Sequence, residues 1–275
     1  MNPIGVMQGR LLPSIGGKVQ AFPKERWKEE FPAAQECNLD HIEWAFDAED
    51  WEKGVLFSNP KAIIELSHLH NIQVIALIAN FFIECPLLRI SSTELEVRLN
   101  VLKSVIDQAK NIGVKFLSIP FLDNSEIKSD SELDQVVYLI SSIIPQAQKV
   151  GIKIGLETSF NPKKFRKLLD AINHPLVKVN YDMGNSAALG YNLDEEIDAY
   201  GLFISTVHIK DRVLGGGTVP LGQGDVDFNR VFYRLADLGY KGPLTLEAAR
   251  DGDEKTTIKK YLEFIDYYLK KYLSC

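Results

Sequence analysis

The spacing between apolar residues alternates along the chain between two values. Short runs with the two-residue alternation of strands are separated by longer segments in which apolar side chains recur every three or four residues, as in amphipathic helices. The three clearest helical stripes consist of Leu95, Leu99, Leu102, Ile106 and Ala109; of Leu133, Val136, Val137, Ile140, Ile143 and Ile144; and of Ile258, Tyr261, Leu262, Ile265, Tyr268 and Leu269. Strands that alternate with helices in this way predict a parallel sheet covered by helices.

Eight segments carry the strand pattern, and helical segments lie between them. They are Ile4–Gln8, His41–Trp44, Val74–Leu77, Phe116–Pro120, Ile154–Glu157, Val177–Asp182, Thr206–Lys210 and Leu244–Glu247. The alternation predicts an α/β fold with a single (β/α)8 TIM barrel over residues 1–275, a length that such barrels commonly have. A doubly wound open sheet is the structural alternative, but no GxGxxG sequence follows the first strand.

Residues with special backbone preferences mark the helix boundaries. Asn or Gly precedes five of the strands, as expected where a helix ends in the left-handed conformation. These residues are Asn38, Asn71, Gly113, Gly151 and Gly239. Two helix starts are indicated by Asn59-Pro60 and Asn161-Pro162, because Asn supplies an N-cap and Pro suits the first turn. The glycine-rich segment Val213–Asp225 predicts a flexible loop, which either closes over a substrate or is only a surface loop.

Four of the predicted strands carry, at or near their ends, a side chain that divalent metals accept: Glu157, Asp182, His208 and Glu247. Successive strand residues point to opposite faces, and each of the four lies opposite the apolar side chains of its strand. A lone Glu or His at a strand end is more often a solvated or hydrogen-bonded rim residue. Reactive groups of barrels gather at the carboxyl ends of the strands, so the joint pattern predicts one metal site there.

Composition and charge narrow the function classes. A hydrophobic content of 45% allows a full core, and a net charge of −6 lacks the basic footprint of a nucleic-acid-binding protein. The longest apolar run, around Val74–Ile83, is too short to cross a membrane. The N-terminus enters a strand-like segment without the pattern of a signal peptide, so we expect a cytoplasmic protein.

Ordered sequence motifs then indicate a family. GVMQGRL, IEW, LETS, YDMGN, VHIKDR followed by PLGQGDVDF, and LEAAR occur in this order along nearly the whole chain. Together they resemble the xylose-isomerase-like superfamily of sugar and sugar-phosphate isomerases and epimerases, which contains tagatose 3-epimerase and the inosose enzymes. The resemblance implies that Glu157, Asp182, His208 and Glu247 hold one divalent ion, and that Glu157 and Glu247 are catalytic and move protons. Asn185 stands where many ketose 3-epimerases carry a His, which leaves the 3-epimerase assignment open.

The donor set suits a chelated ketose. Three carboxylates and one imidazole favour Mn²⁺, with Mg²⁺, Co²⁺ or Zn²⁺ as alternatives, and leave positions for two substrate oxygens. Such chelation would acidify the neighbouring C–H and stabilise an enediolate. Glu157 and Glu247 on opposite sides of the substrate would remove and return the proton. Return to the opposite face of the same carbon is epimerisation, and return to the adjacent carbon is aldose–ketose isomerisation.

Further polar residues near the predicted barrel mouth are candidates for binding the sugar. They are Gln8, Arg10, Glu43, Asn185, Lys210 and Arg212. Arg10, Lys210 or Arg212 would suit a phosphate group, although Lys210 is equally suited to pairing with a carboxylate, and the phosphorylation state stays open.

The leading hypothesis is therefore a metal-dependent isomerase or epimerase of a small sugar or sugar phosphate, with no nucleic-acid or membrane partner and with a homo-oligomer left open. A dehydratase of the inosose type on the same barrel is the alternative. The DNA-repair endonucleases of the superfamily use several histidines in a multi-zinc site, whereas only His208 is suitably placed here. A non-catalytic sugar-binding protein would not need two opposed glutamates.

Overall fold

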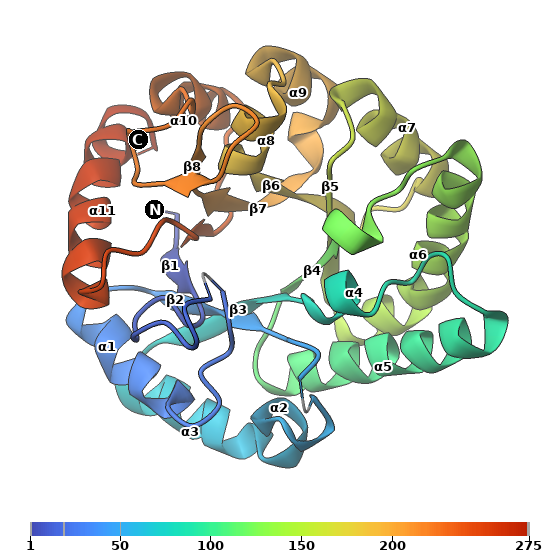
Figure 1. The fold of residues 1–275 in the computed structure, drawn as a ribbon, viewed down its shortest axis with the longest axis horizontal. Helices are drawn as coiled ribbons and strands as arrows, with labels where there is room; N and C mark the ends of the chain where they lie inside the picture. Colours follow the sequence, from blue (N-terminus) through green and yellow to red (C-terminus); the bar gives the residue numbers. More distant parts are fainter. Residues whose placement is uncertain (1, 19, 50, 274–275) are drawn as a thin grey trace.

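Eight parallel strands close into a barrel, and the helices lie outside it (Figure 1). The computed structural model describes residues 2–18, 20–49 and 51–273. The barrel strands are β1 (Ile4–Met7), β2 (His41–Ala45), β3 (Gln73–Ile78), β4 (Phe116–Phe121), β5 (Lys153–Thr158), β6 (Val177–Asp182), β7 (Ile204–Ile209) and β10 (Leu244–Leu246). Neighbours around the barrel follow chain order, and β10 closes it against β1. The predicted TIM barrel is confirmed, and each predicted strand overlaps an observed one.

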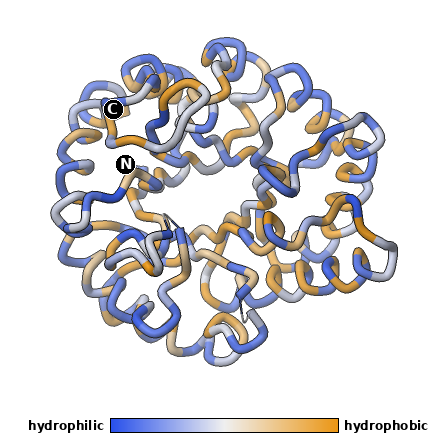
Figure 2. Tube along the Cα trace, viewed as in Figure 1, coloured by the Kyte–Doolittle hydropathy of each residue, from blue (hydrophilic) through white to orange (hydrophobic). Residues whose placement is uncertain are grey.

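The helices alternate with the strands, as the apolar stripes predicted. They are α1 (Glu30–Glu36), α2 (Val55–Ser58), α3 (Pro60–His70), α4 (Phe81–Glu84), α5 (Ser92–Asn111), α6 (Asp130–Val150), α7 (Pro162–Ile172), α8 (Met183–Leu189), α9 (Leu193–Tyr200), α10 (Phe228–Asp237) and α11 (Glu254–Tyr268). Along the outer helices, hydrophilic and hydrophobic stretches alternate (Figure 2). Their apolar sides complete the core, as with Leu102 and Ile106 of α5 and Ile258 of α11. No helix within the described residues combines the length and apolar character needed to cross a bilayer.

The predicted helix boundaries also hold. All five predicted helix-end residues have a positive φ, with values of 55° at Asn38, 53° at Asn71, 96° at Gly113, 75° at Gly151 and 64° at Gly239. At the helix starts, the side chains of Asn59 and Asn161 accept hydrogen bonds from the backbone N–H of Ala62 and Lys164. Asn173 and Gly190 end α7 and α8 in the same left-handed conformation without having been predicted.

Strand register brings the predicted ligands to one level of the barrel. Asp182 at the end of β6 is the direct partner of His208 in β7. The backbone N–H of Glu247, just after β10, donates to the carbonyl of Ile209 at the end of β7 (3.0 Å). Glu157 lies one residue before the end of β5. The four side chains therefore emerge together at the carboxyl end of the barrel.

The glycine-rich segment after β7 is a hydrogen-bonded hairpin. Its strands are β8 (Asp211–Arg212) and β9 (Thr218–Val219), paired antiparallel. The buried carboxylate of Asp211 accepts hydrogen bonds from the backbone N–H groups of Gly222 (2.8 Å), Gly224 (2.9 Å) and Val226 (3.2 Å). A buried anion that satisfies three backbone donors fixes the path of this loop. The predicted closure over a substrate stays a prediction.

Candidate metal centre and active site

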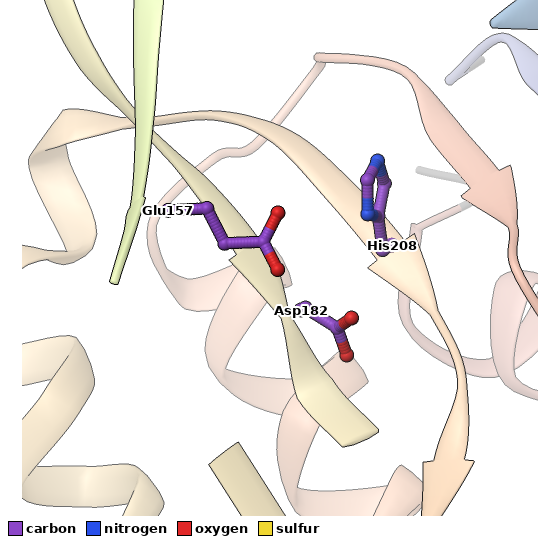
Figure 3. A group of neighbouring side chains, drawn as sticks. All are labelled: Glu157, Asp182 and His208. Carbon is purple, nitrogen blue, oxygen red and sulfur yellow. The ribbon is translucent and has the colours of Figure 1, made fainter. Parts of the chain in front are cut away.

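Three predicted metal ligands converge at the carboxyl end of the barrel. Glu157, Asp182 and His208 each offer a ligand atom, and these atoms all lie within 4.8 Å of one another. Their side chains extend from β5, β6 and β7 and lie close together in Figure 3. All three are buried, with His208 wholly inaccessible. Two carboxylates and one imidazole at this separation form a group that could hold a divalent ion.

The fourth predicted ligand, Glu247, lies next to this group. One of its carboxylate oxygens is 3.0 Å from Nδ1 of His208, and the other accepts a hydrogen bond from Nζ of Lys210 at 2.9 Å. Lys210 Nζ also donates to Asp182 Oδ2 at 3.2 Å, so its ammonium group bridges two of the predicted ligands. Lys210 reaches this position across Gly184 of α8, where an added Cβ would lie 2.8 Å from Lys210 Cγ. Glu247 as a metal ligand remains a prediction.

The two predicted proton-transfer groups have opposite pKa shifts. Burial and the neighbouring charge of Asp182 raise the pKa of Glu157 to about 7. Burial alone would also raise the pKa of Glu247, but Lys210 and His208 outweigh it and hold that pKa well below its usual range. The difference follows from their partners, because Glu247 contacts cationic groups whereas Glu157 contacts neutral amides. A bound divalent cation would lower both values.

Two asparagine side chains hold the carboxylate of Glu157. Asn180 Nδ2 donates to Glu157 Oε2 at 2.8 Å, and Asn185 Nδ2 donates to Glu157 Oε1 at 2.9 Å. Asn180 also lies 3.3 Å from Nδ1 of His208, and its Oδ1 accepts from Thr206 at 2.6 Å. Sequence reasoning did not select Asn180, although it shares the inward face of β6 with Asp182. That shared face was the signal that could have found it.

Three of the predicted sugar-binding residues are buried against the centre. Glu43 is completely inaccessible, and its Oε2 lies 3.0 Å from Nε2 of His208. Burial lowers the pKa of His208, but Glu43 and then Glu247 outweigh it and raise that pKa well above its ordinary value. Gln8 accepts from the backbone N–H of Ala45 at 3.1 Å, and Arg10 approaches Glu247 at 3.7 Å. A large cleft lies above the centre, and the described residues that line it do not include Gln8, Arg10 or Glu43.

The other three predicted sugar-binding residues line a large cleft above the centre. Asn185, Lys210 and Arg212 border it together with Glu157 and Glu247. Arg212 donates to Asn185 Oδ1 at 2.7 Å and, through Nε and Nη2, to the carbonyl of Gly216 at 3.1 and 2.7 Å. The hairpin loop is thus connected through Arg212 and Asn185 to Glu157.

Comparison with known proteins places this chain in a family. A sequence model described as "Xylose isomerase-like TIM barrel" matches residues 31–268. A curated relative, the putative L-ribulose-5-phosphate 3-epimerase SgbU of Haemophilus influenzae, is 24% identical over 270 residues, covering 89% of this chain and 92% of the relative.

Solved structures share the fold. The xylose isomerase domain protein of Planctomyces limnophilus has a TM-score of 0.80 at 19% identity, covering 100% of this chain and 99% of that one. The IOLI protein, whose structure holds a zinc atom, has a TM-score of 0.78 at 19% identity, covering 99% of this chain and 100% of that one. The family match spans well over half of the sequence, and the chain therefore belongs to the xylose isomerase-like TIM barrel family.

Proposed function

We propose that this protein is a divalent-metal-dependent epimerase or isomerase of a sugar or sugar phosphate. The observation that carries the proposal is the convergence of Glu157, Asp182 and His208 beside Glu247 at the carboxyl end of the barrel. The name of the relative from Haemophilus influenzae, a putative L-ribulose-5-phosphate 3-epimerase, supports the same reaction class.

The residues present fit a divalent ion. Glu157, Asp182 and His208 supply oxygen and nitrogen donors within 4.8 Å of one another, and Glu247 is the proposed fourth donor. This set suits Mn²⁺, and Mg²⁺, Co²⁺ and Zn²⁺ remain alternatives. When bound, such an ion polarises a substrate carbonyl and acidifies the adjacent C–H.

Glu157 and Glu247 are the proposed proton-transfer groups. They come from the ends of β5 and β10, which β6 and β7 separate in the barrel order, so they approach a substrate from different sides. Asn180 and Asn185 fix the carboxylate of Glu157, and Lys210 fixes that of Glu247. One carboxylate removes a proton and the other returns it, which inverts the carbon when the return is to the opposite face.

The first test follows proton exchange. The Mn²⁺-loaded protein is incubated in D₂O with a panel of ketoses, ketose phosphates and inososes, and NMR records deuterium incorporation and products. We expect incorporation of deuterium with a new epimer or aldose. Glu157→Gln and Glu247→Gln should each abolish exchange, whereas Glu96→Gln, an exposed glutamate of α5, should retain it.

Two outcomes would contradict the proposal. Full exchange in both active-site variants would remove Glu157 and Glu247 from the mechanism. Loss of water with a new enone absorbance and no epimer would indicate a dehydratase instead.

A further inference from the structure

The cleft above the metal centre is larger than one sugar ring requires. Its volume is about 1710 Å³, whereas pockets that bury drug-sized ligands have about 300–1,000 Å³. Its inner end is bordered by Glu157 and Glu247, and it extends outward to the loops that follow β1 and β2. A ketose bound at the centre would therefore leave the outer end for another group.

Five aromatic residues line the cleft within the described part of the chain, and two of them, on its outer loops, are only partly buried. They are Phe22, in the loop after β1, and Trp51, in the short helix η2 (Trp51–Lys53) after β2. Phe22 packs on the buried Trp44 with ring centroids 5.4 Å apart. Trp51 packs edge-on against Phe57 at 5.3 Å, so both rings are held in place. Aromatic surfaces of this kind suit the apolar C–H face of a sugar ring.

The two loops that carry these rings are joined to each other. The backbone N–H of Phe22 donates to Asp47 Oδ2 at 2.8 Å. Lys24 and Glu49 form an ion pair at 3.0 Å, and Asn80 Nδ2 donates to the other carboxylate oxygen of Asp47 at 3.2 Å. These contacts connect the loops that follow β1, β2 and β3, so hydrogen bonds and an ion pair hold the outer end of the cleft together.

The charges along the cleft do not favour a phosphate group. Near the centre, Arg10 is buried against Glu247 and Lys210 bridges Asp182 and Glu247. Arg212 already donates through three of its nitrogens to Asn185 and Gly216. Within the described residues, the lining carries eight carboxylate and seven cationic side chains, so this part of the cleft is not a cationic pocket. Phosphate recognition generally depends on such cationic groups.

From the size, the aromatic wall and the balanced charge, we propose that the substrate carries a second, uncharged ring that binds at the outer end of the cleft against Phe22 and Trp51. The reacting unit is a ketose at the metal centre, and the second ring is a glycosyl group attached to it. This inference rests on the proposed function for the reacting end and adds the class of substrate.

Three probes that differ at one hydroxyl group test it. They are D-fructose, D-fructose 6-phosphate and isomaltulose, in which a glucosyl ring occupies the position of the phosphate. Calorimetric titration of the Mn²⁺-loaded protein should give a Kd for isomaltulose at least about tenfold lower than for the other two, as expected for burying part of a second ring. Trp51→Ala and Phe22→Ala should remove this preference and leave the Kd of D-fructose unchanged.

Matched variants and a second readout keep the two proposals separate. Trp51→Phe should retain most of the preference, and Tyr138→Ala, which removes an exposed aromatic ring on α6, should retain all of it. Isomaltulose binding no tighter than D-fructose, or a preference that survives both cleft variants, would overturn the second-ring site. Preferential binding without deuterium exchange would instead leave that site standing and contradict the proposed function.

Discussion

The strand ends and the outer loops of this barrel are built in different ways. At the ends of β5, β6, β7 and β10, Glu157, Asp182, His208 and Glu247 are buried or nearly so and contact one another or shared partners. In the loops after β1 and β2, the partly exposed rings of Phe22 and Trp51 pack against other aromatic rings. The strand ends restrict the proposed reacting groups to one geometry, whereas loops tolerate change. Under the two proposals, the strand ends determine the reaction type and the outer loops determine the choice of substrate.

The largest expected effect comes from removing a proposed metal ligand at a strand end. His208→Gln should raise the Kd for Mn²⁺ by at least about 100-fold, because loss of a direct ligand exceeds the cost of losing an outer partner. Calorimetric titration measures the Kd, and circular dichroism checks the fold. His68→Gln, which changes an exposed histidine of α3, should leave the Kd unaltered. Unchanged Mn²⁺ binding in His208→Gln would refute the metal centre.

Replacing Glu43 tests whether this buried carboxylate orients His208 or binds the substrate. Its carboxylate lies 3.0 Å from His208 Nε2 and is completely buried, so Glu43→Gln should weaken Mn²⁺ binding about 10–100-fold by releasing the orientation of the ring. The same titration measures it. A direct contact with sugar predicts the reverse, namely a raised KM for the ketose with an unchanged Kd for Mn²⁺. The two readouts therefore decide between positioning the ligand and binding the substrate.

A buried glutamate of α1 holds the loop after β1 in place. The buried carboxyl of Glu30 in α1 accepts from the backbone N–H of Gly9 at 2.5 Å, and burial raises its pKa to about 8. The folded state then keeps a proton that the unfolded chain releases at lower pH. The stability from this group is complete below the unfolded pKa, and it is lost as pH rises toward 8.

Glu30→Gln cannot ionise, so its free energy of unfolding should rise relative to the natural chain between pH 5 and 8. We expect a gain of about 1–2 kcal/mol, below the full linkage value, because local opening of the loop would hydrate the carboxylate. Urea unfolding at pH 5, 6, 7 and 8 measures it, with the exposed Glu65→Gln as control. Parallel stability curves for Glu30→Gln and the natural chain would contradict a buried neutral carboxyl.

The parts of this molecule with regular backbone are predictable from its sequence. Strand parity predicts that Glu157, Asp182 and His208 lie on the inward face. The observed pairing of Asp182 with His208 brings these side chains close together. Parity gives the face of a strand but not the depth of a side chain within the barrel. Consequently Glu43 was expected at the mouth and lies buried behind His208, and Asn180 was overlooked one inward position below Asp182.

The loops were less predictable because their contacts are between segments distant in sequence. The glycines of Val213–Asp225 indicate flexibility, yet the buried Asp211 accepts hydrogen bonds from two backbone N–H groups of this segment and from that of the next residue, Val226. The ion pair of Lys24 with Glu49 and the bond from Phe22 to Asp47 likewise join two loops that no periodicity relates. Composition alone does not reveal which side chain will meet a given backbone group.

The smallest expected effect lies where the two regions meet, at Arg212. It connects the carbonyl of Gly216 to Asn185, which in turn donates to Glu157 at 2.9 Å. Arg212→Met should lower kcat about 3–10-fold, the value of one hydrogen bond that positions Glu157, with KM for D-fructose and its 6-phosphate unchanged. Arg166→Met, on the exposed side of α7, is the control. A KM increase confined to the phosphate ester would instead make Arg212 a phosphate ligand, which would assign substrate choice to the strand-end region and remove the contrast with the loops.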